Sequence, residues 1–237
     1  MLSIENLSKI YKGSNKGVSN VSLELHEGDI CAFAGANGAG KTTTIKSIVG
    51  IHTFDQGEIN LYEANIKDNP EYFKSLIGYS PDAPTLYNNM TGKAYIELIA
   101  SLYQIEETKL ESRLSYLLRE LKFENAVYDL ISGYSHGMKQ RLVLISLLIH
   151  NPKLIILDEP FVGLDPNATD FLVNEMKTRA SQGAIILFST HVLEVAEKIC
   201  NRLVILNHGK VVVNDLMKNV LETASLNEKF RDVTSDE

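Results

Sequence analysis

The sequence predicts an α/β fold with a mostly parallel sheet, an N-terminal antiparallel β part and an inserted α-helical lobe. Short apolar runs alternate with helical periodicity near both ends of the chain, which is typical of a parallel sheet with helices on both faces. Between these parts, residues 91–149 carry helical patterns without strands. We therefore expect the core at residues 1–88 and 152–220 and the lobe at about 89–151.

The first strands follow from apolar residues near the N-terminus. Apolar positions from Leu2 to Leu7 predict a strand, and a Gly-rich turn at Gly13–Gly17 follows it. Apolar and polar side chains alternate over residues 21–25, which predicts a half-buried strand. The unbroken apolar run Ile30–Ala34 predicts a buried one.

Later elements are predicted from the same two periodicities. The expected strands are Ile59–Leu61, Leu76–Tyr79, Leu154–Leu157, Ala184–Ser189, Leu203–Leu206 and Val211–Val213. The expected helices are one ending at Gly50, two within 91–121 with Thr91 as a cap, and Lys139–Ile149, Asp170–Ala180 and Val192–Cys200. Residues 1–225 are expected to form a single domain, and the polar tail 226–237 is expected to fray.

A phosphate-binding loop is predicted where the strand Ile30–Ala34 meets the next helix. Residues 35–43 read GANGAGKTT and fit the pattern G-x-x-x-x-G-K-[ST]. Such a loop turns backbone N–H groups toward a triphosphate, and the helix N-terminus adds its dipole. A Gly-rich turn that ends in Lys-Thr by chance is the alternative, which the flanking strand and helix disfavour. The residues expected to hold the nucleotide here are Gly35, Ala36, Asn37, Gly38, Ala39, Gly40, Lys41, Thr42 and Thr43.

Two carboxylates follow the buried strand Leu154–Leu157, within the sequence LIILDEP. Open α/β sheets bind ligands at this carboxyl edge of their strands. Asp158 is therefore expected to hold Mg²⁺ with the Thr42 hydroxyl, and Glu159 to polarise an attacking water. Lys41 is expected to reach the β- and γ-phosphates and to act in catalysis. A plain strand exit is the alternative for Asp-Glu-Pro, and the phosphate loop upstream weighs against it.

Residues 134–141, which read YSHGMKQR, resemble the signature of the ATP-binding-cassette (ABC) family. The family form is usually Leu-Ser-Gly-Gly-Gln followed by x-Gln-Arg. Ser135 and Gly137 keep their places, whereas the other three positions of the first five depart from that form. An earlier frame at Ile131–Gly133 is disfavoured by the register of the Gln-Arg pair. Taken alone, the segment could also be a capped helix. The resemblance implies that Ser135 and Gly137 bind the γ-phosphate of ATP.

Four further positions resemble the family. Gly163-Leu164-Asp165 is similar to its D-loop, which implies that Asp165 acts at a dimer interface. His191, after Ser189-Thr190, is similar to its switch histidine and would contact the γ-phosphate and position water. Tyr11 lies where the family stacks a ring on adenine. Asp82 replaces the usual glutamine of the Q-loop, where a carboxylate can still meet Mg²⁺ or water. Taken alone, His191 could be structural and Tyr11 a core residue.

The resemblance covers essentially the whole chain and implies a function. It implies a P-loop NTPase core that hydrolyses ATP to ADP and phosphate, with Mg²⁺ as cofactor. It also implies a homodimer with each ATP between the P-loop of one copy and the signature of the other, driving separate integral membrane subunits. The stretches Met138–Arg141 and Ser189–Glu197 resemble those of single-cassette exporters of drugs, lipids or peptides. The chain is then expected at the cytoplasmic face of the cell membrane, bound peripherally through its partner.

Bulk properties exclude some classes of function. The 237-residue chain has a formal net charge of −7, which argues against nucleic acid as a partner, because phosphate binding needs a basic face. The N-terminus lacks the pattern of a signal peptide, and the apolar run Leu142–Ile149 is too short to span a bilayer. A soluble protein is expected. Cys31 and Cys200 show no metal-type spacing and are expected as buried small hydrophobes.

Three other branches of the family are alternatives to the transporter hypothesis. The translation-factor branch usually carries two cassettes, and this chain has one P-loop. The chromosome and repair branch needs a long coiled coil between P-loop and signature, and the segment between them is too short for one. A soluble ATPase of the iron–sulfur-assembly kind stays open as the alternative, which a soluble rather than an integral partner would distinguish.

Overall fold

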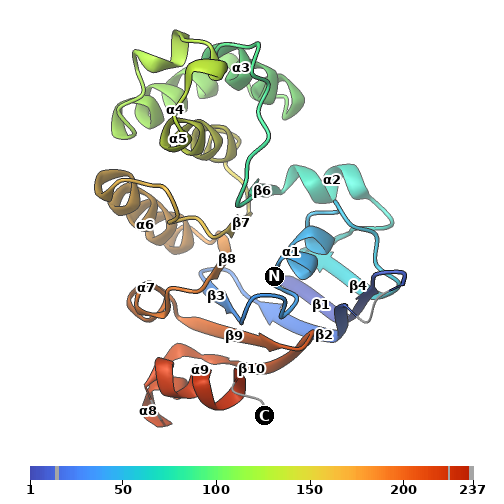
Figure 1. Cartoon of the computed structure of the whole chain (residues 1–237). Coiled ribbons are helices and arrows are strands. Elements are labelled where there is room, and N and C mark those ends of the chain that lie inside the picture. The colour runs from blue at the N-terminus through green and yellow to red at the C-terminus, as the bar shows by residue number, and fades with distance from the viewer. Residues whose placement is uncertain (14–15, 224, 235–237) are drawn as a thin grey trace.

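A six-stranded sheet forms the centre of the fold, with strand order β10-β9-β3-β8-β7-β6 (Figure 1). The computed structural model describes residues 1–13, 16–223 and 225–234. Neighbouring strands are parallel except for the edge strand β10, which is antiparallel to β9. The strands are β3 (Ile30–Ala34), β6 (Ile77–Ser80), β7 (Leu154–Asp158), β8 (Ile185–Thr190), β9 (Arg202–Asn207) and β10 (Lys210–Leu216). The predicted mostly parallel sheet is confirmed.

A second, antiparallel sheet has the order β2-β1-β4-β5. Its strands are β1 (Leu2–Ile10), β2 (Gly17–Leu25), β4 (Gln56–Leu61) and the two-residue β5 (Ala64–Asn65). The predicted N-terminal antiparallel part is therefore confirmed. The predicted turn at Gly13–Gly17 includes positions 14 and 15, which lie outside the described residues.

The helices complete two cores on opposite faces of the central sheet. They are α1 (Lys41–Ile48), α2 (Pro70–Ser75), α3 (Gly92–Leu102), α4 (Glu107–Glu120), α5 (His136–Leu148), α6 (Pro166–Ser181), α7 (Leu193–Ile199), α8 (Met217–Thr223) and α9 (Leu226–Thr234). Alternate residues of β3 face the two cores: Ala32 lies in the one shared with α5 and α6, and Phe33 in the one shared with α1 and the antiparallel sheet. This alternation explains why β3 is apolar at every position.

The helical lobe α3–α5 gathers at one end of the molecule, and α8 and α9 lie at the other, beside β9 and β10 (Figure 1). Thr91 caps α3 as predicted, since its Oγ1 accepts the Ala94 N–H at 3.2 Å. Two short 3₁₀ turns, Ala126–Tyr128 and Ile131–Gly133, connect α4 to α5. The predicted split of the chain into core and lobe stays a prediction, because it concerns domain boundaries rather than elements.

The expectation of a frayed tail is wrong for residues 226–234, which form α9. Apolar side chains recur at Leu226, Phe230 and Val233 and belong to or pack on the core, with Leu226 fully buried. The side-chain amide of Asn207 also donates to the Val233 carbonyl at 3.0 Å. High charge in this segment therefore marks the solvent face of an amphipathic helix rather than disorder.

Both cysteines are free and buried, as predicted, and burial raises the pKa of each thiol. Within residues 1–13, 16–223 and 225–234, no helix has the length and apolar character needed to cross a bilayer.

Candidate nucleotide-binding site

The phosphate loop begins where the buried strand β3 ends and turns into α1. Gly40 precedes the helix with φ +108°, a left-handed conformation that favours glycine. A Cβ on Gly40 would lie 2.4 Å from Cγ1 of Val18, so the loop also needs glycine for space. The N–H groups at the start of α1 then point into the loop, as a bound phosphate requires.

Lys41 lies across this loop. Its Nζ donates to the carbonyl of Gly35 at 2.6 Å and to that of Ala36 at 3.3 Å. Burial lowers the pKa of Lys41, and the carboxylates of Glu159 and Asp158 oppose this shift. The ammonium group is thus held over the loop by carbonyl oxygens, which phosphate oxygens could replace.

The sheet brings Asp158 next to the start of α1. Thr42 Oγ1 donates to Asp158 Oδ2 at 3.4 Å, and Ser189 Oγ donates to Asp158 Oδ1 at 2.5 Å. The pair Thr42 and Asp158 offers the few oxygen ligands that Mg²⁺ takes from a protein when phosphates and water supply the rest. No cluster of three or more His, Cys, Asp or Glu side chains suited to a metal occurs in the described part of the chain.

Glu159 and His191 lie 32 positions apart in sequence and meet at the ends of adjacent strands. Strands β7 and β8 pair in parallel with Asp158 opposite Ser189, which places the residues that follow them together. His191 Nδ1 lies 2.8 Å from Glu159 Oε2. Glu159 has φ +50°, a strained backbone conformation for a residue with a side chain, and such strain gathers at functional sites.

Ser189 is a site residue whose contacts sequence reasoning missed. Besides holding Asp158, its Oγ accepts the backbone N–H of Glu159 at 2.9 Å. One hydroxyl therefore orients both carboxylate-bearing residues. The signal was present in the sequence, since a polar residue ending a buried strand next to the Asp-Glu strand must lie at this edge.

A cleft of about 420 Å³ unites most of the predicted nucleotide-binding residues. Of these, the ones that line it are Tyr11, Asn37, Gly38, Gly40, Lys41, Thr42, Thr43, Asp82, Asp158 and Glu159. Lys16 and Gly17 also line the cleft, although they were not predicted from the sequence as site residues. A basic residue in the Gly-rich turn before the phosphate loop could have indicated them. The cleft is large enough for a nucleotide.

Tyr11 lies at the rim of this cleft and not in the core. It is 37% exposed, and its hydroxyl lies 3.2 Å from Thr43 Oγ1. Its ring meets that of His52 edge to face at 5.9 Å. Stacking on a nucleobase requires an aromatic ring at the mouth of the cleft, and Tyr11 supplies one.

The signature residues lie elsewhere. Ser135 caps α5 by accepting the Met138 N–H at 3.3 Å, and Tyr134 is buried beneath it. Within the described residues, neither Ser135 nor Gly137 lines the cleft around the P-loop. Asp165 caps α6, accepting the N–H groups of Asn167 and Ala168, and forms an ion pair with Arg141. Among the residues that the structure describes, these three predicted site residues therefore lie outside the lining of the cleft around the P-loop of the same chain.

The Arg141–Asp165 pair predicts a pH dependence. The hydrogen bond from Arg141 lowers the pKa of Asp165, so the contact stabilises the fold at neutral pH and this contribution is lost as pH falls through the lowered pKa. Replacing Arg141 with Met should raise the pKa of Asp165 and lower stability at pH 7 by less than about 1 kcal/mol, because the pair is partly exposed. NMR titration, and denaturant unfolding at pH 7 and at a pH below the titration of Asp165, would measure both effects. An equal loss of stability at the two pH values would contradict this origin; Arg119→Met, which breaks the exposed pair with Glu120, is the control.

A phosphate loop at a helix N-terminus, facing two carboxylates at the end of a parallel strand, defines a P-loop protein that binds and hydrolyses a nucleotide. A family model described as "ABC transporter" matches residues 18–162. The chain belongs to this family and is an ABC transporter ATPase that binds ATP.

Similar proteins cover nearly the whole chain. EcsA of Bacillus subtilis (strain 168), an ABC-type transporter ATP-binding protein, is 34% identical over 100% of this chain and 98% of its own length. SkfE of the same organism, named as the ATP-binding protein of SkfA peptide export, is 34% identical over 90% of this chain and 87% of its own. A solved structure of an ATP-binding subunit of an ABC transporter superposes with a TM-score of 0.94 at 34% identity, covering 98% of this chain and 99% of that one.

Proposed function

We propose that the chain is the ATP-hydrolysing subunit of an exporter for a drug, lipid or peptide. It would lie at the cytoplasmic face of the cell membrane, held there by separate integral membrane subunits. Two observations support export: the form of the signature at Met138–Arg141, and the similarity to SkfE, whose own name refers to peptide export. The cargo path would belong to the membrane subunits.

The position of the signature residues Ser135 and Gly137 supports the proposal that the cassette works as a homodimer. Ser135 and Gly137 stand at the N-terminus of α5, where free N–H groups suit a phosphate, yet their own P-loop cleft lies apart from them. A second copy placed head to tail would bring them to its γ-phosphate. ATP then holds the two copies together, and its hydrolysis lets them separate. This change between a closed and an open dimer would act as a conformational switch on the membrane subunits.

The chemistry would consist mainly of positioning and charge stabilisation. Lys41 would contact the β- and γ-phosphates, and Thr42 and Asp158 would hold Mg²⁺, with Asp82 facing the metal or its water across the cleft. The bound Mg²⁺ would neutralise charge that develops on the phosphates. Glu159 would polarise the attacking water, and His191 would fix the Glu159 carboxylate through the contact described above.

A groove beside the lobe is proposed to receive the membrane subunit. It has a volume of about 140 Å³ and lies between the loop after β6 and helices α3 and α5. Tyr79 and Leu86, predicted from the sequence to contact the partner, both line it. Burial raises the pKa of Tyr79 to about 12, and the nearby Asp158 and Asp82 carboxylates add to the shift. Tyr79 therefore lies between the groove and the nucleotide cleft.

This docking site makes a direct prediction. Replacing both Tyr79 and Leu86 with Asp should abolish copurification of the membrane subunit, because two charges would enter an apolar contact. ATP binding by the isolated cassette should be retained. The matched control replaces the exposed Tyr72 and Leu102 with Asp. Partner capture that is unchanged in the Tyr79/Leu86 variant would refute the assignment.

The function itself is tested by identifying the partner. A tagged Glu159→Gln cassette, expressed in its native organism, would be purified from detergent-solubilised membranes with ATP, and mass spectrometry would identify the proteins that accompany it. An integral protein with several spans is expected. Purification without ATP is the control. Reproducible recovery of soluble companions alone would overturn the transporter proposal in favour of the assembly-type ATPase.

A further inference from the structure

His136 is one of the positions at which this chain departs from the usual signature, and the structure shows what its ring contacts. It is the first residue of α5, directly after the cap Ser135. A Cβ built on Gly163 would lie 2.5 Å from His136 Cδ2 and 2.7 Å from Nε2. The imidazole ring therefore rests on the backbone of Gly163, which adopts φ +80° and has no room for a side chain.

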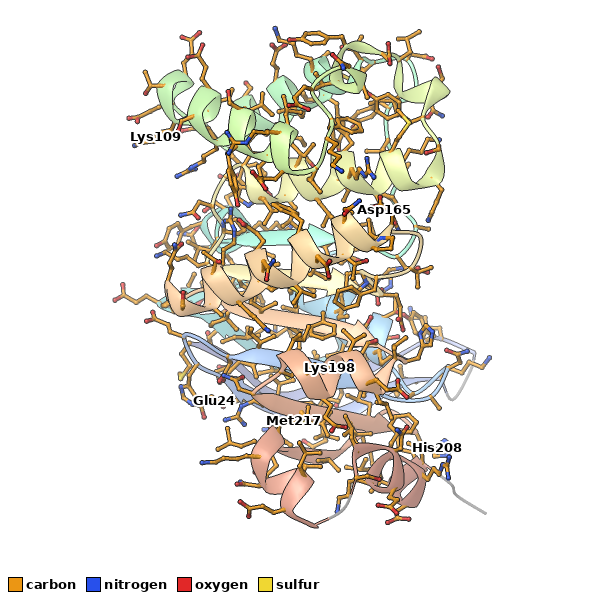
Figure 2. The ribbon with its side chains drawn as sticks, turned by 90° about the vertical axis from the view of Figure 1, so that its left-hand side faces the viewer. Glu24, Lys109, Asp165, Lys198, His208 and Met217 are labelled. Atoms are coloured by element: carbon orange, nitrogen blue, oxygen red, sulfur yellow. The ribbon has the colours of Figure 1, made fainter. Side chains whose placement is uncertain are left out.

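Two more residues of α5 hold the same loop. The Oε1 atom of Gln140, one helical turn after His136, lies 3.1 Å from the same Cβ position. Arg141 pairs with Asp165 at the far end of the loop; Figure 2 labels Asp165 at the start of α6, next to α5. Gln140 also lines a small cavity together with Glu159. The N-terminal part of α5 thus contacts Gly163 and Asp165 within the segment 160–165, which we call the post-Glu159 loop.

The post-Glu159 loop continues directly from the strained residue Glu159. The Val162 N–H donates to the Glu159 carbonyl at 3.3 Å, so the chain turns tightly here. Strand β7 fixes the loop at one end, and the contacts of α5 fix it at the other. Any shift between α5 and β7 must then be absorbed over a few residues that begin at Glu159.

We propose that His136 is a positioning residue for ATP hydrolysis, because its ring couples the start of α5 to the post-Glu159 loop and so sets the position of Glu159. The inference rests on the ATPase activity of the chain and not on the identity of its cargo or membrane partner. The ring acts by its shape and its contact with Gly163. Small displacements of catalytic groups reduce turnover without a matching loss of binding.

Truncation of the ring tests this role. His136→Ala should lower kcat for ATP hydrolysis about tenfold while the KM for Mg·ATP changes by less than about twofold, since the P-loop, Ser135 and Gly137 are all unchanged. His136→Phe should restore most of kcat, because a flat ring again covers Gly163. The matched control is His26→Ala, which removes an exposed histidine whose neighbour Glu24 is labelled in Figure 2 well away from Asp165. Thermal unfolding of each variant would show that the fold is retained.

Three kinetic results would contradict the proposed role of His136. An unchanged kcat in His136→Ala, or a rise in KM alone, would overturn the proposal. Failure of His136→Phe to restore turnover would also overturn it, because the nitrogen atoms rather than the ring shape would then matter.

A double-mutant cycle tests the contact itself. Gly163→Ala adds a methyl group that meets the ring only when His136 is present, whereas its contact with Gln140 Oε1 and the backbone strain at φ +80° are common to both backgrounds. Gly163→Ala should therefore lower kcat more in the native background than in His136→Ala. Additive effects would show that the two residues act independently.

Discussion

Replacing Glu159 with Gln is expected to reduce ATP hydrolysis by about a hundredfold or more while ATP binding is retained. Glutamine keeps the shape of the side chain and can still contact His191, but it cannot accept a proton from water. Loss of a positioned general base costs about 10²- to 10⁴-fold in rate. Because ATP would remain bound, the variant should also accumulate as a dimer under saturating Mg·ATP. Steady-state hydrolysis, a nucleotide-binding titration and light scattering would measure the three effects.

A matched control separates catalysis from a general loss of charge. Glu194→Gln removes a carboxylate in the first turn of α7, close in sequence to His191 and exposed to solvent. It should hydrolyse ATP at nearly the native rate. A Glu159→Gln protein that turns over ATP normally would rule out Glu159 as the base. One that remains monomeric under saturating Mg·ATP would instead refute the proposed homodimer.

The second large effect is expected at Lys41. Lys41→Met keeps the length of the side chain and removes the ammonium group that Gly35 and Ala36 now bind. Hydrogen bonds to charged groups contribute about 1.5–3 kcal/mol, so the Kd for ATP should rise about ten- to a hundredfold. Hydrolysis should be lost as well, because the same group would stabilise the transferred phosphate.

Isothermal titration with ATP would measure this loss directly. Lys46→Met, in the last turn of the same helix and outside the cleft, is the control and should bind ATP normally. The prediction fails if Lys41→Met binds ATP with the native affinity. It also fails if the control loses affinity equally, because a general change in charge would then explain the result.

The strands of the central sheet could be predicted from sequence because both faces of that sheet are covered. Residues 30–34 and 154–157 are apolar at every position, and both runs form buried strands. The loop that follows the first run carries its own chemical pattern. Together these signals were enough to predict the P-loop, Asp158 and Glu159 on one edge of the sheet.

The N-terminal ends of two helices were predicted several residues too late, because the capping residues that start them lie outside the apolar pattern. Helix α6 begins at Pro166, not near Asp170, since Asp165 accepts the N–H groups of Asn167 and Ala168 and Pro166 fits the first helical position. Helix α5 begins at His136, three residues earlier than predicted, since Ser135 is its cap. Periodicity of apolar residues detects the buried part of a helix and misses the exposed first turn.

Contacts between distant segments could not be read from the sequence. Nothing in the pattern around Gly163 predicts that His136 would rest on it, because this contact depends on how the lobe packs against α6. Similarly, the amphipathic nature of α9 was obscured by its charge, although Leu226, Phe230 and Val233 have helical spacing. Local pattern gave the residue types of the site, and tertiary packing decided which of them meet.

The double role of Ser189 has a consequence for amide hydrogen exchange. The Glu159 amide is bonded to a side-chain hydroxyl and not to the carbonyl of a neighbouring strand. Its exchange with solvent therefore reports whether one hydroxyl is in place, whereas ladder amides of β7 report the opening of the sheet. Since the same hydroxyl also binds Asp158, this single amide is a natural probe of whether the two carboxylates are aligned. Measuring the exchange rate of this amide while ATP is added and then hydrolysed would show whether the two carboxylates align before or after the chemical step.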